Sequence, residues 1–168
     1  MALSANHDAD TFAAQSVAES KLVAPLLLRA LTGQDDPPPN DGLTSALEIE
    51  VLALILHVMD RHVFQCLGPQ RRDEFMNELL VATKRLLPSP LAEGFADTYN
   101  SRNQYYGRMS KLYPPTGENL KGTVFWEFAK AMASVYANSN PAAVMAATLL
   151  AMESEKFVRE LLNSEHVR

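Results

Sequence analysis

The sequence predicts an all-α protein, a single-domain bundle of about six helices with no significant β-sheet. Apolar residues recur at helical spacing through several long segments, and no segment alternates apolar and polar residues between hairpin turns. Proline and glycine divide the chain at intervals that suit helices. The 168 residues, 47% of them hydrophobic and 21% charged, suffice for one domain, 1–168, with its own core.

The first helix is expected over residues 10–31, where Pro25 should either kink the helix or split it in two. Residues 1–9 are expected to be a frayed end. Residues 34–41 form a proline-rich loop, since three consecutive prolines favour extended, stiff polyproline geometry. Because this loop is extended, the sequence leaves open whether the first helix packs on its own bundle or on that of a neighbouring chain.

A second helix is expected over residues 41–67 and a third over residues 69–87. Gly68 should end the second helix, and Pro69 suits the first position of the third. Ser45, with a glutamate three residues later, has the spacing of a capping box near the start of the second helix.

The fourth helix is expected to follow directly, over residues 89–113. Ser89 suits its N-cap and Pro90 its first helical position. Its apolar stripe is rich in tyrosine, and two consecutive prolines should end it. A turn then separates this helix from the next.

The last two helices are marked by an apolar stripe and a cap. The fifth carries the stripe over residues 124–136, and Asn140 is expected to cap the sixth, over residues 141–162. Residues 163–168 are expected to be a frayed end. Short loops between long helices make neighbouring helices antiparallel, so the whole should be a bundle with mixed crossing angles.

Residues 51–59 of the second helix are apolar on every side, the pattern of a central helix covered by others. This run is far shorter than the roughly 20 residues that cross a bilayer. The N-terminal segment also lacks the basic and apolar regions of a signal peptide. We therefore expect a soluble, cytoplasmic protein without a membrane partner.

The same central helix holds polar residues where apolar ones are expected, and such breaks of local rules often mark function. Glu50, His57 and Arg61 are separated by seven and four residues, so they share one face. Asp60 lies beside them. On the fourth helix, Arg102 interrupts an otherwise apolar and aromatic stripe.

A charge buried in a bundle costs several kcal/mol unless it is paired. The third helix carries Arg72 on its inward stripe and so adds one more charge to those already named. We therefore predict that Glu50, Asp60, Arg72 and Arg102 pair among themselves and fix the packing of the helices.

The alternative is a ligand pocket, in which Arg102 holds a carboxylate or phosphate beside His57 and Glu50. This hypothesis requires a cavity of at least about 300 Å³ next to His57. Its candidate ligand-binding residues are Glu50, His57, Asp60, Arg61, Arg102 and Tyr106.

Motifs and charge disfavour other kinds of site. The Glu-x-x-His and His-Glu-x-x-His patterns are missing, and a single cysteine, Cys66, excludes the usual structural zinc sites, so neither a metal nor a cofactor is predicted. A glycine-rich phosphate loop and a nucleophile elbow are missing too, so no catalytic residue is assigned. The net charge of −5 argues against a nucleic-acid partner.

The faces of two helices favour function by binding. The sixth helix carries many small or adaptable side chains, namely Ala142, Ala143, Met145, Ala146, Ala147, Ala151 and Met152. The fourth helix could present Tyr105, Tyr106 and Tyr113, and tyrosine is enriched at interfaces. We therefore expect a non-enzymatic homodimer, or an adaptor for another protein partner.

Overall fold

The computed structural model describes residues 5–34, 41–109, 120–136 and 140–165, and in these ranges the chain forms six helices and no strand. This confirms the predicted all-α bundle. The helices are α1 (Ala5–Thr32), α2 (Asp41–Leu67), α3 (Pro69–Leu86), α4 (Ser89–Gly107), α5 (Val124–Val135) and α6 (Pro141–Glu165). Most of the expected proline-rich loop, residues 35–40, lies outside the described residues.

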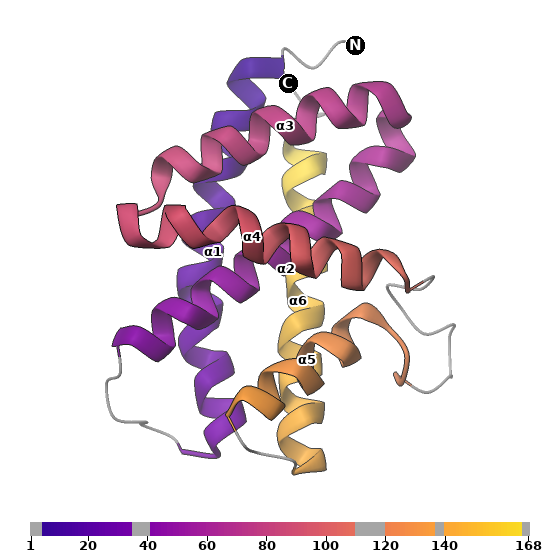
Figure 1. Cartoon of the computed structure of the whole chain (residues 1–168). Helices are drawn as coiled ribbons and strands as arrows, with labels where there is room; N and C mark the ends of the chain where they lie inside the picture. The colour runs from indigo at the N-terminus through magenta and orange to yellow at the C-terminus, as the bar shows by residue number, and fades with distance from the viewer. Residues whose placement is uncertain (1–4, 35–40, 110–119, 137–139, 166–168) are drawn as a thin grey trace.

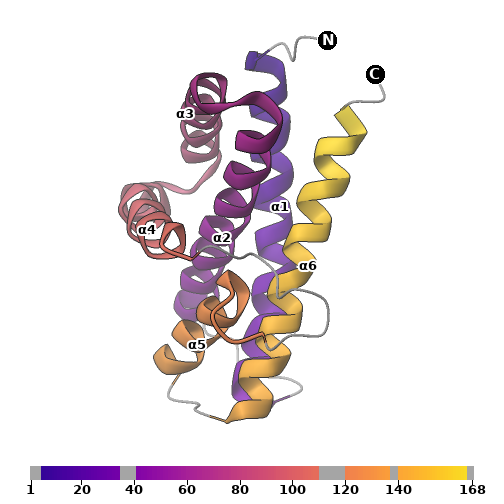
Figure 2. The same ribbon diagram turned by 90° about the vertical axis from the view of Figure 1, so that its right-hand side faces the viewer.

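The helices are arranged around α2 (Figure 1). Turned by 90°, the molecule shows α1 and α6 on one side of α2, and α3 and α4 on the other, with α5 against α6 (Figure 2). Helices α1 and α6 run antiparallel, so that the end of α1 lies near the beginning of α6 (Figures 1 and 2). Helix α1 packs on α2, α3 and α6.

Helix α2 is the central helix that the sequence predicts, because every residue from 51 to 60 is buried. Neighbours on all sides explain why its apolar residues show no preferred face. Among the described residues, α2 is the one helix long and apolar enough to cross a membrane, but 61% of its most apolar window is buried inside the protein. A core helix has the same composition, and that is the role α2 has here.

Helix α1 is longer than expected and continuous. Pro25 does not split it; the proline lies on the exposed side, where the carbonyl that loses its hydrogen bond can reach water. The helix begins at Ala5, and Ala9 is buried in the core, so the expectation of a frayed end is wrong for residues 5–9.

The junction of α2 and α3 forms as predicted. Gly68 has a positive φ of 76°, which glycine adopts without strain, and its N–H donates to the carbonyl of Phe64. Pro69 is the first residue of α3. At its other end α2 begins at Asp41, so Ser45 lies within the helix instead of capping it.

The ends of α4 differ from the prediction. Pro88, not Ser89, is the N-cap residue, and its carbonyl accepts the first helical hydrogen bonds. Helix α4 ends at Gly107 instead of reaching residue 113, and residues 110–119 lie outside the described part of the chain. The early end has a tertiary cause, which the contacts of Arg61 explain below.

The caps of the last two helices are side chains. Thr123 accepts a hydrogen bond from the N–H of Trp126 at the start of α5. Asn140 accepts one from Ala142 at the start of α6, as predicted. Helix α6 continues through Glu165, so residues 163–165 are helical and not a frayed end.

Candidate functional site

The inward charges are paired as predicted. Arg102 donates from Nε and Nη2 to the two carboxylate oxygens of Glu50, both at 2.6 Å, and so joins α4 to α2. Arg72 makes the same two-point contact with Asp60 through Nε and Nη2, and so joins α3 to α2. Two-point contacts of this kind are the strongest geometry for an arginine and a carboxylate. These two pairs connect α2 to both helices on that side of the molecule.

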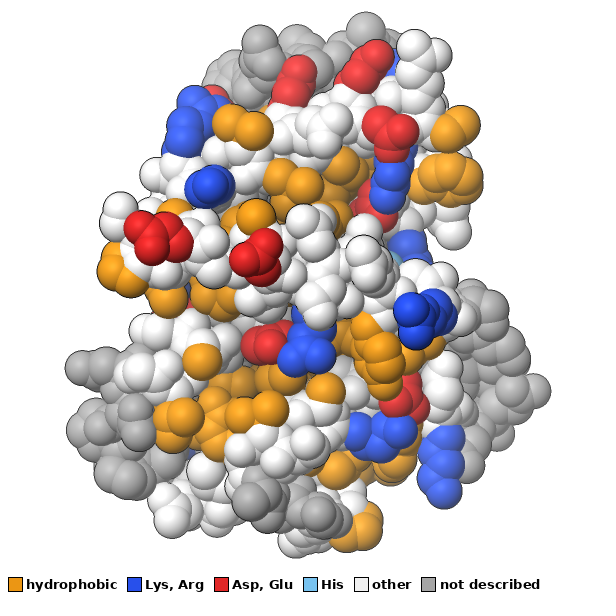
Figure 3. Space-filling model, viewed as in Figure 1, with side chains coloured by type: hydrophobic (Ala, Val, Ile, Leu, Met, Phe, Trp, Pro, Cys, Tyr) orange, Lys and Arg blue, Asp and Glu red, His pale blue; other side chains and the backbone are white. Residues whose placement is uncertain are grey.

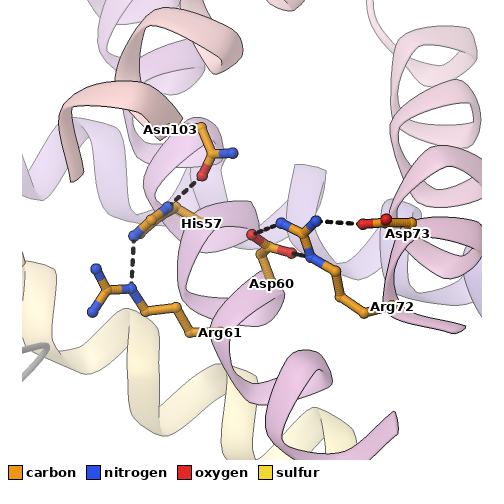
Figure 4. A network of polar contacts seen from close by, with 6 residues as sticks. All are labelled: His57, Asp60, Arg61, Arg72, Asp73 and Asn103. Carbon is orange, nitrogen blue, oxygen red and sulfur yellow. Dashed lines mark hydrogen bonds and ion pairs between the residues drawn. The ribbon is translucent and has the colours of Figure 1, made fainter. Parts of the chain in front are cut away.

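A separate set of contacts surrounds His57 (Figure 4). Its Nδ1 lies 2.6 Å from Oδ1 of Asn103, and Arg61 donates from Nε to its Nε2 at 3.0 Å. Because arginine can only donate, Nε2 must carry no proton, and the proton of the ring must be on Nδ1, facing Asn103. Burial lowers the pKa of His57, as does the Arg61 cation, so the ring is neutral.

Arg61 also fixes the end of α4. Its Nη2 donates to the carbonyl of Tyr106 at 2.8 Å and to that of Met109 at 2.5 Å. The last carbonyls of a helix have no partner within the helix, and a cation there is favoured by the helix dipole. Arg61 therefore acts as a C-terminal cap for α4 from a different helix.

The structure divides the six predicted site residues among several contacts. Glu50 and Arg102 form one pair, His57 and Arg61 another, and Asp60 points away from His57 toward α3, where it meets Arg72 (Figure 4).

The aromatic member of the predicted set, Tyr106, is fully buried, with its ring centroid 5.3 Å from that of His57. It packs the core and is not available to a partner. Tyr105 is partly exposed and donates to Glu127 at 3.0 Å, and Tyr113 lies outside the described residues.

Sequence reasoning missed Asn103, which orients His57. A weak signal was available, because 99, 103 and 106 share one helical face and the other two positions hold inward tyrosines. A polar residue on such a face is a candidate partner for a buried histidine.

A pocket of about 270 Å³ lies at the other end of this region, between α2, α4 and α5. Glu50 is the one predicted site residue among its lining; His57 is not part of it and is 2% exposed. In the space-filling view, which has the orientation of Figure 1, hydrophobic side chains gather in the region between α4 and α5 (Figure 3). The polar cluster and the pocket thus meet only at Glu50.

A contact between α2 and α6, absent from the predictions, involves Glu155 on α6. Glu155 is buried, lies 3.4 Å from Nε2 of His62 on α2, and accepts from Nε of Arg159, one turn further along α6, at 2.6 Å. The two arginine–carboxylate pairs thus hold α3 and α4 to the central helix.

The alanines of α6 divide between two faces. Ala143, Ala147 and Ala151 are buried against the bundle, whereas Ala142 is exposed and Ala146 is partly exposed. The buried alanines pack α6 into the bundle, and the other two lie on its outer side.

The outer sides of α1 and α6 expose large apolar residues. Leu22 and Leu26 on α1, and Met145 and Leu149 on α6, have exposed fractions between 41% and 67%. The two helices pack against each other, and the end of α1 lies near the beginning of α6 (Figure 2). We call these four side chains the α1–α6 face.

The described residues offer no metal centre, because no three His, Cys, Asp or Glu side chains among them could hold an ion together. The arrangement instead consists of paired charges around α2, a pocket beside Glu50 and the exposed α1–α6 face. In comparisons with known proteins, no family model, curated protein or solved structure matches this chain.

Proposed function

We propose that this chain works by binding, as a homodimer that forms through the α1–α6 face. The observation that carries the proposal is the gathering of four large apolar side chains on two adjacent antiparallel helices. Full burial of one such side chain contributes about 1.5–3 kcal/mol. Contiguous exposed apolar surface is typical of protein interfaces, because it is costly to leave in water.

A second copy of the chain fits this face because the face is self-complementary. A two-fold axis parallel to the helices places α1 of one copy on α6 of the other, in an antiparallel direction. Apolar groups of the two copies then meet one another.

The state of the inward polar residues supports binding over catalysis. A catalytic acid or base must reach its substrate within hydrogen-bond distance. Both ring nitrogens of His57 are occupied by protein partners, and the ring is buried. Asp60 and Arg72 hold each other. These residues connect helices, and they leave the outer surface for recognition.

Replacement of single residues tests this interface. Leu149→Glu, or Leu22→Glu, should convert the dimer to a monomer, since an unpaired carboxylate would be buried; we expect the dimer dissociation constant to rise about 100-fold or more. Val81→Glu on α3 is the matched control, because Val81 is 60% exposed outside the face. Sedimentation velocity measures the dimer dissociation constant of each variant. Equal effects of all three changes, or none, would contradict the proposed interface.

A further inference from the structure

The pocket between α2, α4 and α5 has apolar walls and one acidic side chain. Its lining includes Leu47, Leu91, Met132 and Tyr136, and Glu50 is the one charged residue among the described residues that line it. Three helices contribute to the walls, so the pocket belongs to the tertiary fold. Pockets that bind small molecules have this build, in which apolar walls surround a few polar groups.

Glu50 has hydrogen-bonding capacity left on both oxygens. Arg102 supplies one donor to each carboxylate oxygen, at 2.6 Å. An ionised carboxylate offers about four acceptor positions, so about two stay open. The side chain is 20% exposed, which leaves it accessible from the pocket. Arg102 also neutralises the charge, so the ligand needs a donor but no net charge.

Gly94 keeps the pocket open on the α4 side. A Cβ atom placed on this residue would meet no other atom within 4 Å, and the residue lines the pocket. Within a helix, glycine costs about 0.5–1 kcal/mol relative to alanine, and no positive φ requires it here. Glycine therefore leaves space beside the pocket at a position where alanine would stabilise the helix.

We propose that this pocket binds a small, mostly apolar organic molecule that carries one hydroxyl or amino donor, with the donor on Glu50 and the apolar body between α4 and α5. The volume of about 270 Å³ sets the size. A cavity of about 150 Å³ holds benzene, so this pocket suits a body of about two fused rings. The site is independent of the α1–α6 face, which lies on the other side of α2 (Figure 2).

A matched series of naphthalene compounds tests the ligand chemistry in the full-length protein. The probes are 2-naphthalenemethanol, 2-(aminomethyl)naphthalene, 2-methylnaphthalene and 2-naphthoate, titrated into ¹⁵N-labelled protein and followed by amide chemical shifts. The alcohol and the amine should bind about tenfold more tightly than the methyl compound, because only they donate to a carboxylate. The naphthoate should bind most weakly, since its carboxylate would face that of Glu50.

Variants of α4 test the location. Gly94→Leu fills the pocket and should weaken binding of the alcohol at least about tenfold. Ala96→Leu adds the same side chain to an exposed position on another side of the same helix and should leave affinity unchanged. Glu50→Gln should reduce the amine to the affinity of the methyl compound, because the amide oxygen stays on Arg102 and the amide NH2 cannot accept from an ammonium group.

Two results would overturn the proposal. One is the absence of saturable binding by the alcohol and the amine at millimolar concentration. The other is binding that Gly94→Leu and Ala96→Leu change equally. The comparison of Gly94→Leu with Ala96→Leu keeps the test valid if Glu50→Gln fails to fold, because neither leucine variant changes the contact between Glu50 and Arg102.

Discussion

At the scale of single residues, His57 determines how stability depends on pH. Its pKa is lowered in the folded chain by burial first and by Arg61 among its neighbours, whereas the hydrogen bond to Asn103 opposes the shift. In the unfolded chain, His57 therefore binds a proton near pH 6.5, whereas in the folded chain it binds one only at lower pH. The contribution of His57 is intact above about pH 6.5 and is lost as pH falls from there toward the folded-state pKa.

The variant His57→Gln keeps an acceptor for Arg61 and a donor for Asn103 but cannot titrate. The free energy of unfolding of the wild-type protein should fall more steeply than that of the variant between pH 7.5 and pH 5.5, as measured by urea denaturation. Parallel pH profiles would contradict this assignment, as would an NMR titration that places the His57 pKa at or above 6.5.

The two inward ion pairs should differ in strength because they differ in exposure. Asp60 is 8% exposed and Arg72 28%, against 20% for Glu50 and 24% for Arg102. Removal of an arginine leaves its carboxylate without compensation, at a cost that rises with the burial of that carboxylate. Arg72→Ala should therefore lower the free energy of unfolding by about 2–4 kcal/mol and Arg102→Ala by about 1–2 kcal/mol. Double-mutant cycles with the carboxylates measure both pairs, and the reverse order would contradict this expectation.

At the scale of elements, Arg61 decides where α4 ends. Arg61→Ala should release the carbonyls of Tyr106 and Met109 and fray the last turn of α4, with a loss of about 1–2 kcal/mol. Hydrogen exchange of peptides covering residues 100–109 should accelerate, while that of α3 should not. Arg85→Ala is the control, because its pair with Asp10 is about two-thirds exposed on both sides and should contribute under about 0.5 kcal/mol. Equal exchange in both variants would refute the capping role.

Local sequence signals predicted most element boundaries, because their causes are local. Gly68 and Pro69 determine the junction of α2 and α3 through backbone geometry alone, and Asn140 caps α6 from two residues away. The end of α4 was missed because its cause, Arg61, lies about 45 residues earlier in the chain. The start of α1 was missed because packing of residues such as Ala9 against other helices extends it.

The sequence identified the inward charged residues of the site but not which of them contact one another. Helical spacing correctly placed the charges inward, and the cost of burial correctly required them to pair. Spacing could not tell which carboxylate meets which arginine, since that depends on how α3 and α4 cross α2. The pocket beside Glu50 was beyond prediction, because it arises where three helices leave space and where Gly94 adds no side chain.

At the scale of the whole molecule, the polar and apolar features serve different purposes. Ion pairs connect α2 to α3 and α4, the His57 contacts also connect α2 to α4, and together they fix one arrangement of these helices. The apolar α1–α6 face then stays available on the side away from α3 and α4 (Figure 2). The inward charges therefore stabilise the fold, and we propose that the outer face serves assembly.

Native mass spectrometry of the purified full-length chain tests this account most directly. We expect the main species at micromolar concentration to have twice the chain mass of 18.6 kDa, and the Leu149→Glu variant to have the single mass. A wild-type protein that stays monomeric over the same concentrations would contradict the proposed function.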